Sequence, residues 1–249
     1  NQIITPQRVR FVAITVIVIA VILLIFSFIS AHNRKTVFGP QLGADFASFY
    51  LAGQILNSPE PERLYDIPLQ NQLYHELLPE VSEGKTLPFP YAPFLAILVK
   101  PLALVSYEIA FGAWLVINLV CYILGFLLLW RSNPDLTEHS VLTPLFVAVS
   151  FAPFLLEGLI CGQSVGLIIL FLGLSFYLQV KGQHWAGGVI LSLCLFKPTL
   201  LVLVVPMLLV SGKLKAFVGF LIGSVALVGV SWLAVGLEGL HGYVNLLLT

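Results

Sequence analysis

Residues 11–31 read FVAITVIVIAVILLIFSFISA, an apolar stretch without one charged side chain. A helix needs about 20 apolar residues to cross the hydrocarbon core of a bilayer, so this stretch is long enough to span a membrane. It lacks a small-residue cleavage site, and long apolar stretches recur at 109–130 and 216–236. We therefore expect an uncleaved anchor at the start of an all-α polytopic membrane protein.

The composition of the whole chain agrees with a lipid environment. Hydrophobic residues make up 59% of the 249 and charged residues 10%, against about 25% charged residues in a soluble domain. The formal net charge is zero, so no basic surface for nucleic acid is expected. The three cysteines lie in apolar segments without paired spacing, and no histidines share metal-ligand spacing. We expect no metal site and no cofactor.

Basic residues beside the apolar segments predict the topology. Arg8 and Arg10 precede the first span and place the N-terminus in the cytoplasm by the positive-inside rule. Residues 32–106 then form an outer loop, which is acidic overall up to residue 89. Four further basic residues flank later apolar segments and are expected in the cytoplasm: Arg131, Lys181, Lys213 and Lys215.

The remaining spans are expected within residues 107–236. The stretch 91–105 is short and interrupted by prolines, so it predicts a surface-lying or re-entrant helix. Together with the first span, the later segments give about seven membrane segments. All of them belong to one transmembrane module, 1–249, which we expect to be a fragment of a longer protein. These later segments are 107–130, 141–158, 164–180, two short helices within 185–211 that meet at Lys197-Pro198, and 214–236.

The outer loop contains two candidate amphipathic helices. Asp45 is expected to cap the first, which ends at Asn57-Ser58-Pro59. The second covers 66–78 and places three leucines on one face. We expect both helices to lie along the membrane surface. Asp45 has two compatible interpretations, either a helix cap or a carboxylate held in place to remove a proton from a hydroxyl.

Glu157 and Lys197 are ionisable side chains inside spanning stretches. A charge at bilayer depth costs about 2.5–3.5 kcal/mol, so such residues usually face a wet cavity or a partner. Lys197 is either a point charge for a phosphate or a lysine that snorkels to the interface. Glu157 either supports the nearby Gly162-Gln163 turn or pairs with Lys197. The predicted topology brings this turn, Lys197 and Asp45 to the same outer side.

Two uncharged residues are further candidates for substrate contacts. Gln163 either hydrogen-bonds a sugar or caps the helix that follows. Tyr91 stands among alternating aromatic and proline residues, which either line a lipid or sugar groove or form a stiff interfacial turn.

Several short motifs, in this order, resemble glycosyltransferase family 87, the polyprenol-phosphate-mannose-dependent mannosyltransferases of the GT-C class. The resemblance covers nearly the whole chain. It rests on Asp45-Phe46 with Phe49-Tyr50 and Ala52-Gly53, Leu64-Tyr65-Asp66, Phe89-Pro90-Tyr91-Ala92-Pro93 with Pro101-Leu102, Gly162-Gln163, and Phe196-Lys197-Pro198.

The resemblance implies a GT-C-like helical bundle with juxtamembrane helices in its first outer loop. It implies a polyprenyl-phosphate sugar donor, with mannose the expected sugar, and a glycolipid or glycan acceptor. Asp45 would be the general base. The protein would lie in a bacterial inner membrane, with its active site facing outward. Members often carry Gly-Gln-x-Asn where this chain reads Gly162-Gln163-Ser164-Val165, so the family's asparagine is replaced by valine here.

The function expected from these residues is an inverting sugar transfer. Asp45 would take the proton of an acceptor hydroxyl, Lys197 would stabilise the departing polyprenyl phosphate, and Gln163, Tyr91 and Glu157 would contact substrate. A lipid or sugar transporter without transferase activity is the alternative, although no inverted repeat is visible in the sequence. A non-catalytic membrane scaffold is the third interpretation.

Overall fold

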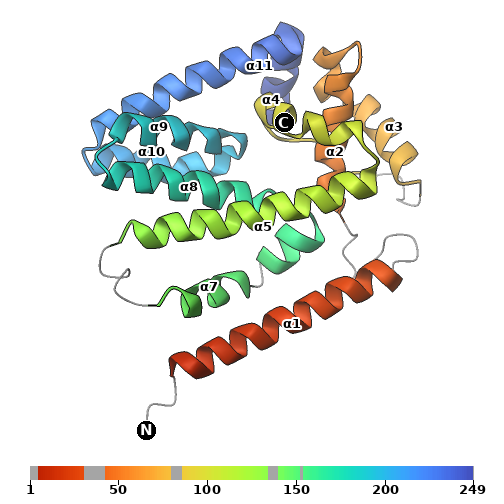
Figure 1. Ribbon diagram of the computed structural model, residues 1–249. Helices are drawn as coiled ribbons and strands as arrows, with labels where there is room; N and C mark the ends of the chain where they lie inside the picture. Colours follow the sequence, from red (N-terminus) through yellow and green to blue (C-terminus); the bar gives the residue numbers. More distant parts are fainter. Residues whose placement is uncertain (1–4, 31–42, 80–85, 134–139, 152–153, 249) are drawn as a thin grey trace.

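The structure is a computed structural model that describes residues 5–30, 43–79, 86–133, 140–151 and 154–248 (Figure 1). All regular secondary structure in these ranges is helical, which confirms the predicted all-α class. The predicted end of the first span at Ala31 lies outside the described residues, as do the loop residues 32–42 and 80–85.

Three of the described helices are long and apolar enough to cross a membrane. They are α1 (Pro6–Ser30), α5 (Tyr107–Arg131) and α11 (Leu214–Leu248). A fourth crossing is possible if α7 (Leu142–Val149) and the π-helical segment η4 (Phe154–Ile160), which are inclined by 62°, act as one span. The predicted count of about seven membrane segments is therefore not confirmed.

The shorter apolar helices complete the bundle. Figure 1 shows α5 beside α8 (Val165–Val180), and α9 (His184–Ser192) between α8 and α11, while α7 separates α5 from α1. The predicted break at Lys197-Pro198 is confirmed, because the helical turn η5 (Leu193–Phe196) ends before Lys197 and η6 (Pro198–Leu200) leads into α10 (Leu201–Val210).

Glycines allow two of these helix pairs to approach closely. A Cβ atom added at Gly173 of α8 would lie 3.0 Å from the Cα atom of Gly125 of α5. A Cβ atom at Gly188 of α9 would lie 2.7 Å from the backbone nitrogen of Phe220 of α11. Both distances are too short for a real side chain, so backbones pack directly against one another, as is common between membrane helices.

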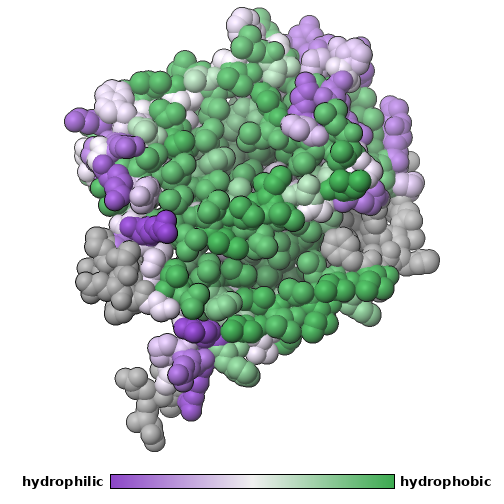
Figure 2. Space-filling model, viewed as in Figure 1, coloured by the Kyte–Doolittle hydropathy of each residue, from purple (hydrophilic) through white to green (hydrophobic). Residues whose placement is uncertain are grey.

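The two ends of the bundle differ in charge. The C-terminal ends of α5 and α8 and the N-terminal ends of α1 and α11 lie at one end, on the left in Figure 1, and these ends carry the basic residues used to predict the topology. The loop helices lie at the other end. Between the ends, Figure 2 shows a broad apolar surface with hydrophilic residues at its margins. This arrangement is that of a protein that spans a bilayer.

The first loop helix, α2 (Ala44–Asn57), forms the centre of the core rather than lying on a membrane surface. Ten of its residues are buried, and they occupy all of its faces. Phe49 packs with ring centroids 5.4 Å from Trp114 of α5 and 5.1 Å from Tyr91, which precedes α4 (Pro93–Val99). The helix is present at the predicted residues, but the prediction that it is amphipathic, with one apolar face, is wrong.

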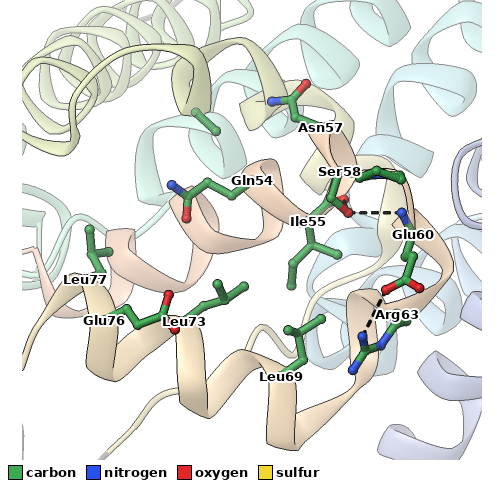
Figure 3. A pocket seen from close by; sticks show the side chains of 12 residues that line it. Gln54, Ile55, Asn57, Ser58, Glu60, Arg63, Leu69, Leu73, Glu76 and Leu77 are labelled. Carbon is green, nitrogen blue, oxygen red and sulfur yellow. Dashed lines mark hydrogen bonds and ion pairs between the residues drawn. The ribbon is translucent and has the colours of Figure 1, made fainter.

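The second loop helix, α3 (Ile67–Leu77), agrees with the predicted range, and Asp66 caps it by accepting a hydrogen bond from the backbone nitrogen of Leu69. Its predicted leucine face lines a groove of about 730 Å³ beside the end of α2. Figure 3 shows Leu69, Leu73 and Leu77 along this groove, with Ile55 opposite and Arg63 paired to Glu60 at its rim.

The last helix bends at Gly236, the residue at which the final span was predicted to end. Its φ of 65° and ψ of −174° are an allowed backbone conformation for glycine and a strained one for other residues. Beyond this kink, α11 returns to the outer loop and packs against η2 (Pro61–Tyr65), where Tyr243 lies 5.3 Å from Tyr65 between ring centroids. This final segment was not predicted.

Candidate active site

The N-terminus of α2 holds Asp45 without using its side chain as a cap. Gly43 is the N-cap residue, with φ 70°, and no side chain caps the helix. Instead, the backbone nitrogens of Asp45 and Phe46 donate to the carbonyl oxygen of Cys161 at 3.0 and 3.2 Å, and that of Gly43 donates to Ile160 at 2.8 Å. The prediction that Asp45 caps this helix is wrong, because a distant turn satisfies the donors that a cap would satisfy.

The turn that supplies these carbonyl groups, residues 160–164, is held from several sides. Gly162 has φ 79°, and its carbonyl oxygen accepts a hydrogen bond of 2.6 Å from the indole nitrogen of Trp114. The backbone nitrogen of Gln163 donates to the carbonyl oxygen of Glu157 at 2.9 Å. The turn is therefore a rigid support for the side chains at 161 and 163.

The amide of Asn118 holds the helix that follows this turn. Its Oδ1 atom accepts from the backbone nitrogen of Gly166 at 2.9 Å, and its side chain is fully buried. Neither Asn118 nor Trp114 was predicted as part of the site. Asn118 could have been found from the sequence, because it is a polar amide inside an apolar spanning stretch, where such groups need a partner.

The structure brings all five predicted site residues to one place. The side chain of Gln163 hydrogen-bonds the Asp45 carboxylate, and Lys197 and Glu157 are close enough to act on it electrostatically. The hydroxyl of Tyr91 donates to Oε1 of Gln163 at 3.1 Å. Asp45 comes from the start of α2 and Tyr91 from the segment before α4. Glu157 belongs to η4, Gln163 to the turn before α8, and Lys197 to the break after η5.

Burial and charge together set the protonation of Asp45. Burial raises the pKa of its carboxyl above the ordinary value, and the neighbouring carboxylate of Glu157 raises this pKa further. The hydrogen bond from Gln163 and the charge of Lys197 act in the opposite direction. A half-buried carboxylate with a raised pKa is the kind of group that serves as a general base near neutral pH.

A metal ion has a limited set of candidate ligands here. One oxygen each of Asp45 and Glu157 and the sulfur of Cys161 lie within 4.8 Å of one another. Two carboxylates and a neutral thiol offer less charge and fewer donors than a structural zinc or calcium site uses.

Two apolar grooves are lined by residues that lie close in sequence to the site residues. One, of about 270 Å³, lies between α1 and η4 and is lined by Leu156, Leu159 and Ile160, which flank Glu157 in sequence. The other, of about 280 Å³, lies between α4, η5 and α11 and includes Ala92 and Leu195, close in sequence to Tyr91 and Lys197. The larger groove of Figure 3 lies instead at the far end of α2.

Comparison with protein families gives one match. The model described as Glycosyltransferase family 87 matches residues 89–249, more than half of the chain. The matched part includes Tyr91, Glu157, Gln163 and Lys197, whereas Asp45 precedes it. No curated protein and no solved structure matches the chain.

Proposed function

Since the chain belongs to glycosyltransferase family 87 and is therefore a membrane glycosyltransferase, we propose that it transfers a sugar, expected to be mannose, from a polyprenyl phosphate to a hydroxyl group. The acceptor would be a glycolipid or glycan on the non-cytoplasmic face of a bacterial inner membrane. The proposal depends on one observation above all: Asp45 and Lys197, which are far apart in the chain, lie within electrostatic range of each other beside Gln163.

The proposed reaction is a single displacement with inversion. The acceptor oxygen bonds to the anomeric carbon of the sugar as the bond from that carbon to the phosphate oxygen breaks. Asp45 accepts the hydroxyl proton, a role worth about 10²–10⁴-fold in rate. The polyprenyl phosphate departs as an anion, and Lys197 stabilises its charge. Gln163, Tyr91 and Glu157 line the space beside the reacting groups.

The apolar surroundings fit a lipid-linked donor. We place the prenyl chain in the groove between α4, η5 and α11, because Leu195 lines this groove two residues before Lys197. The phosphate of the donor would then lie at Lys197, and the prenyl chain attached to it would lie in the groove, away from water. Such a donor never leaves the bilayer, which gives a physical reason for a transferase built from membrane helices.

Sugar transfer by purified protein in vesicles that contain polyprenyl-phospho-mannose and membrane glycolipid extract tests the proposal. Asp45→Asn should abolish transfer of radiolabelled mannose, and Lys197→Ala should weaken use of the donor. Asp66→Asn is the matched control, because Asp66 is a loop carboxylate that pairs with Arg63 away from the site. Full activity of Asp45→Asn would refute the assignment of the base.

A transporter is the competing function. It would move labelled lipid or sugar across sealed vesicles without forming a new glycosidic bond. Label bound covalently to acceptor supports the transferase, and label that only changes sides supports the transporter.

A further inference from the structure

We infer that Tyr91 and Gln163 are positioning residues that orient the Asp45 carboxylate, in place of the sugar contacts expected from the sequence. The inference rests on the proposed function, since it assigns a task to residues around the proposed base. Three observations carry it: the direction of the hydrogen bonds, the anchoring of both residues, and the surroundings of the carboxylate.

The hydrogen bonds run in one direction. Oε1 of Gln163 accepts from the Tyr91 hydroxyl at 3.1 Å, so the amide nitrogen is the group that faces Asp45. An ionised carboxylate accepts hydrogen bonds and donates none, and the amide nitrogen is a donor. The reverse orientation of the amide would place Oε1, an acceptor, against the carboxylate. The ionised carboxylate thus selects the orientation of the amide, and the Tyr91 hydroxyl holds Gln163 in place by its hydrogen bond to the opposite side of that amide.

Both residues are anchored by elements outside the site. The ring of Tyr91 is buried, with centroid distances of 5.1 Å to Phe49 and 6.3 Å to Phe196. The backbone of Gln163 is fixed by its bond to Glu157 and by the bond of Trp114 to the preceding carbonyl group. A residue that is packed on both sides serves better to fix a neighbour than to follow a moving substrate.

Several groups face the carboxylate, and the effect of the Gln163 amide must be separated from theirs. Glu157 of η4, Cys161 of the turn, Tyr74 of α3, Tyr91 and Lys197 all lie near Asp45. Gln163 is uncharged, so it acts through one directed hydrogen bond. That bond uses one lone pair of the carboxylate, and the remaining lone pairs can accept a proton from the acceptor hydroxyl.

The pH dependence of kcat separates positioning from sugar binding. Loss of the amide bond raises the pKa of Asp45, so the acidic limb of the profile should move to higher pH. We expect Gln163→Ala to reduce kcat on this limb by about three- to tenfold and Tyr91→Phe to reduce it less, with the plateau at higher pH retained. A sugar contact would instead raise KM and leave the limb in place.

Tyr122→Phe is the matched control for Tyr91→Phe. Tyr122 is also a buried tyrosine, and its hydroxyl bonds the carbonyl oxygen of Ala148, away from Asp45. Its profile should coincide with that of the unmodified protein. If Tyr91→Phe unfolds, the Gln163→Ala profile alone decides between the two roles.

The outcomes also distinguish this inference from the proposed function. Activity of Asp45→Asn equal to that of the unmodified protein refutes the base, and the inference with it. An inactive Asp45→Asn together with an unmoved acidic limb in Tyr91→Phe and Gln163→Ala keeps the base and refutes the positioning role. A shifted limb in both variants and not in Tyr122→Phe supports it.

Discussion

Replacement of Gly162 by alanine should destabilise the protein through two separable effects. The first is backbone strain, because φ at this residue is 79° and a left-handed conformation costs other residues about 1–2 kcal/mol. The second is a steric clash, because the added Cβ atom would lie 2.7 Å from Cβ of Phe46 and 3.0 Å from Cε2 of Phe111. Ordinary contacts begin at 3.4 Å, so Phe46 would have to move by about 0.7 Å within a core of aromatic rings, where overpacking costs about 1–3 kcal/mol.

Gly182 isolates the first effect. It has the same φ of 79°, and no heavy atom lies within 4 Å of an added Cβ atom. Gly182→Ala should therefore lose about 1–2 kcal/mol and Gly162→Ala about 2–5 kcal/mol. Thermal unfolding of the two purified variants in the same detergent compares these losses, and the drop in Tm should be about 1.5 to 4 times as large for Gly162→Ala. Equal losses would show that Phe46 does not pack against this turn.

Two further predictions concern the helix crossing and the site. Gly173→Ala should lower Tm, because the new methyl group would clash with the backbone of Gly125 where α5 and α8 pack together. Gly112→Ala, on the open face of α5, should not lower it. Thermal unfolding of both variants in the same detergent checks this. Glu157→Gln removes a charge that raises the pKa of Asp45, so the acidic limb of the kcat profile should move to lower pH and the shift should shrink in high salt. An acidic limb unchanged by this substitution would mean that Asp45 does not control it.

The long helices and the chain breaks follow from local sequence. The uninterrupted apolar stretches predict α1, α5 and the first part of α11, since backbone groups in lipid must be satisfied within the helix. Lys197-Pro198 predicts the break between η5 and η6 in the same way, because proline cannot continue a helix without strain. The number of crossings does not follow, since α7 and η4 are too short to assign by length alone.

The burial of α2 could not be predicted from its own residues. Its aromatic side chains look like the apolar face of a surface helix, but they pack against Trp114 and Tyr107, which are supplied from α5. Serine and glycine on the remaining face are small enough to be buried as well, and a Cβ atom added at Gly53 would lie only 2.9 Å from Cβ of Ala103. Tertiary contacts thus turn a moderately amphipathic segment into a core helix.

The cap of α2 illustrates the same limit at the site. A carboxylate at a helix start usually bonds the backbone nitrogens of the first turn, and Asp66 does this at α3. At α2 the same task falls to the carbonyl groups of Ile160 and Cys161, more than 100 residues further along the chain. The Asp45 carboxylate therefore takes no part in capping α2 and is hydrogen-bonded by Gln163 instead.

These backbone bonds also tie together two parts of the chain. The outer loop carries Asp45 and lies before the family match, whereas the turn at 160–164 lies within it. Because the loop donates three backbone hydrogen bonds to that turn, movement of either part would displace the carboxylate relative to Gln163. The distance between the proposed base and its orienting amide is set by these bonds, so the site depends on the packing of α2 against the turn as much as on the identity of its side chains.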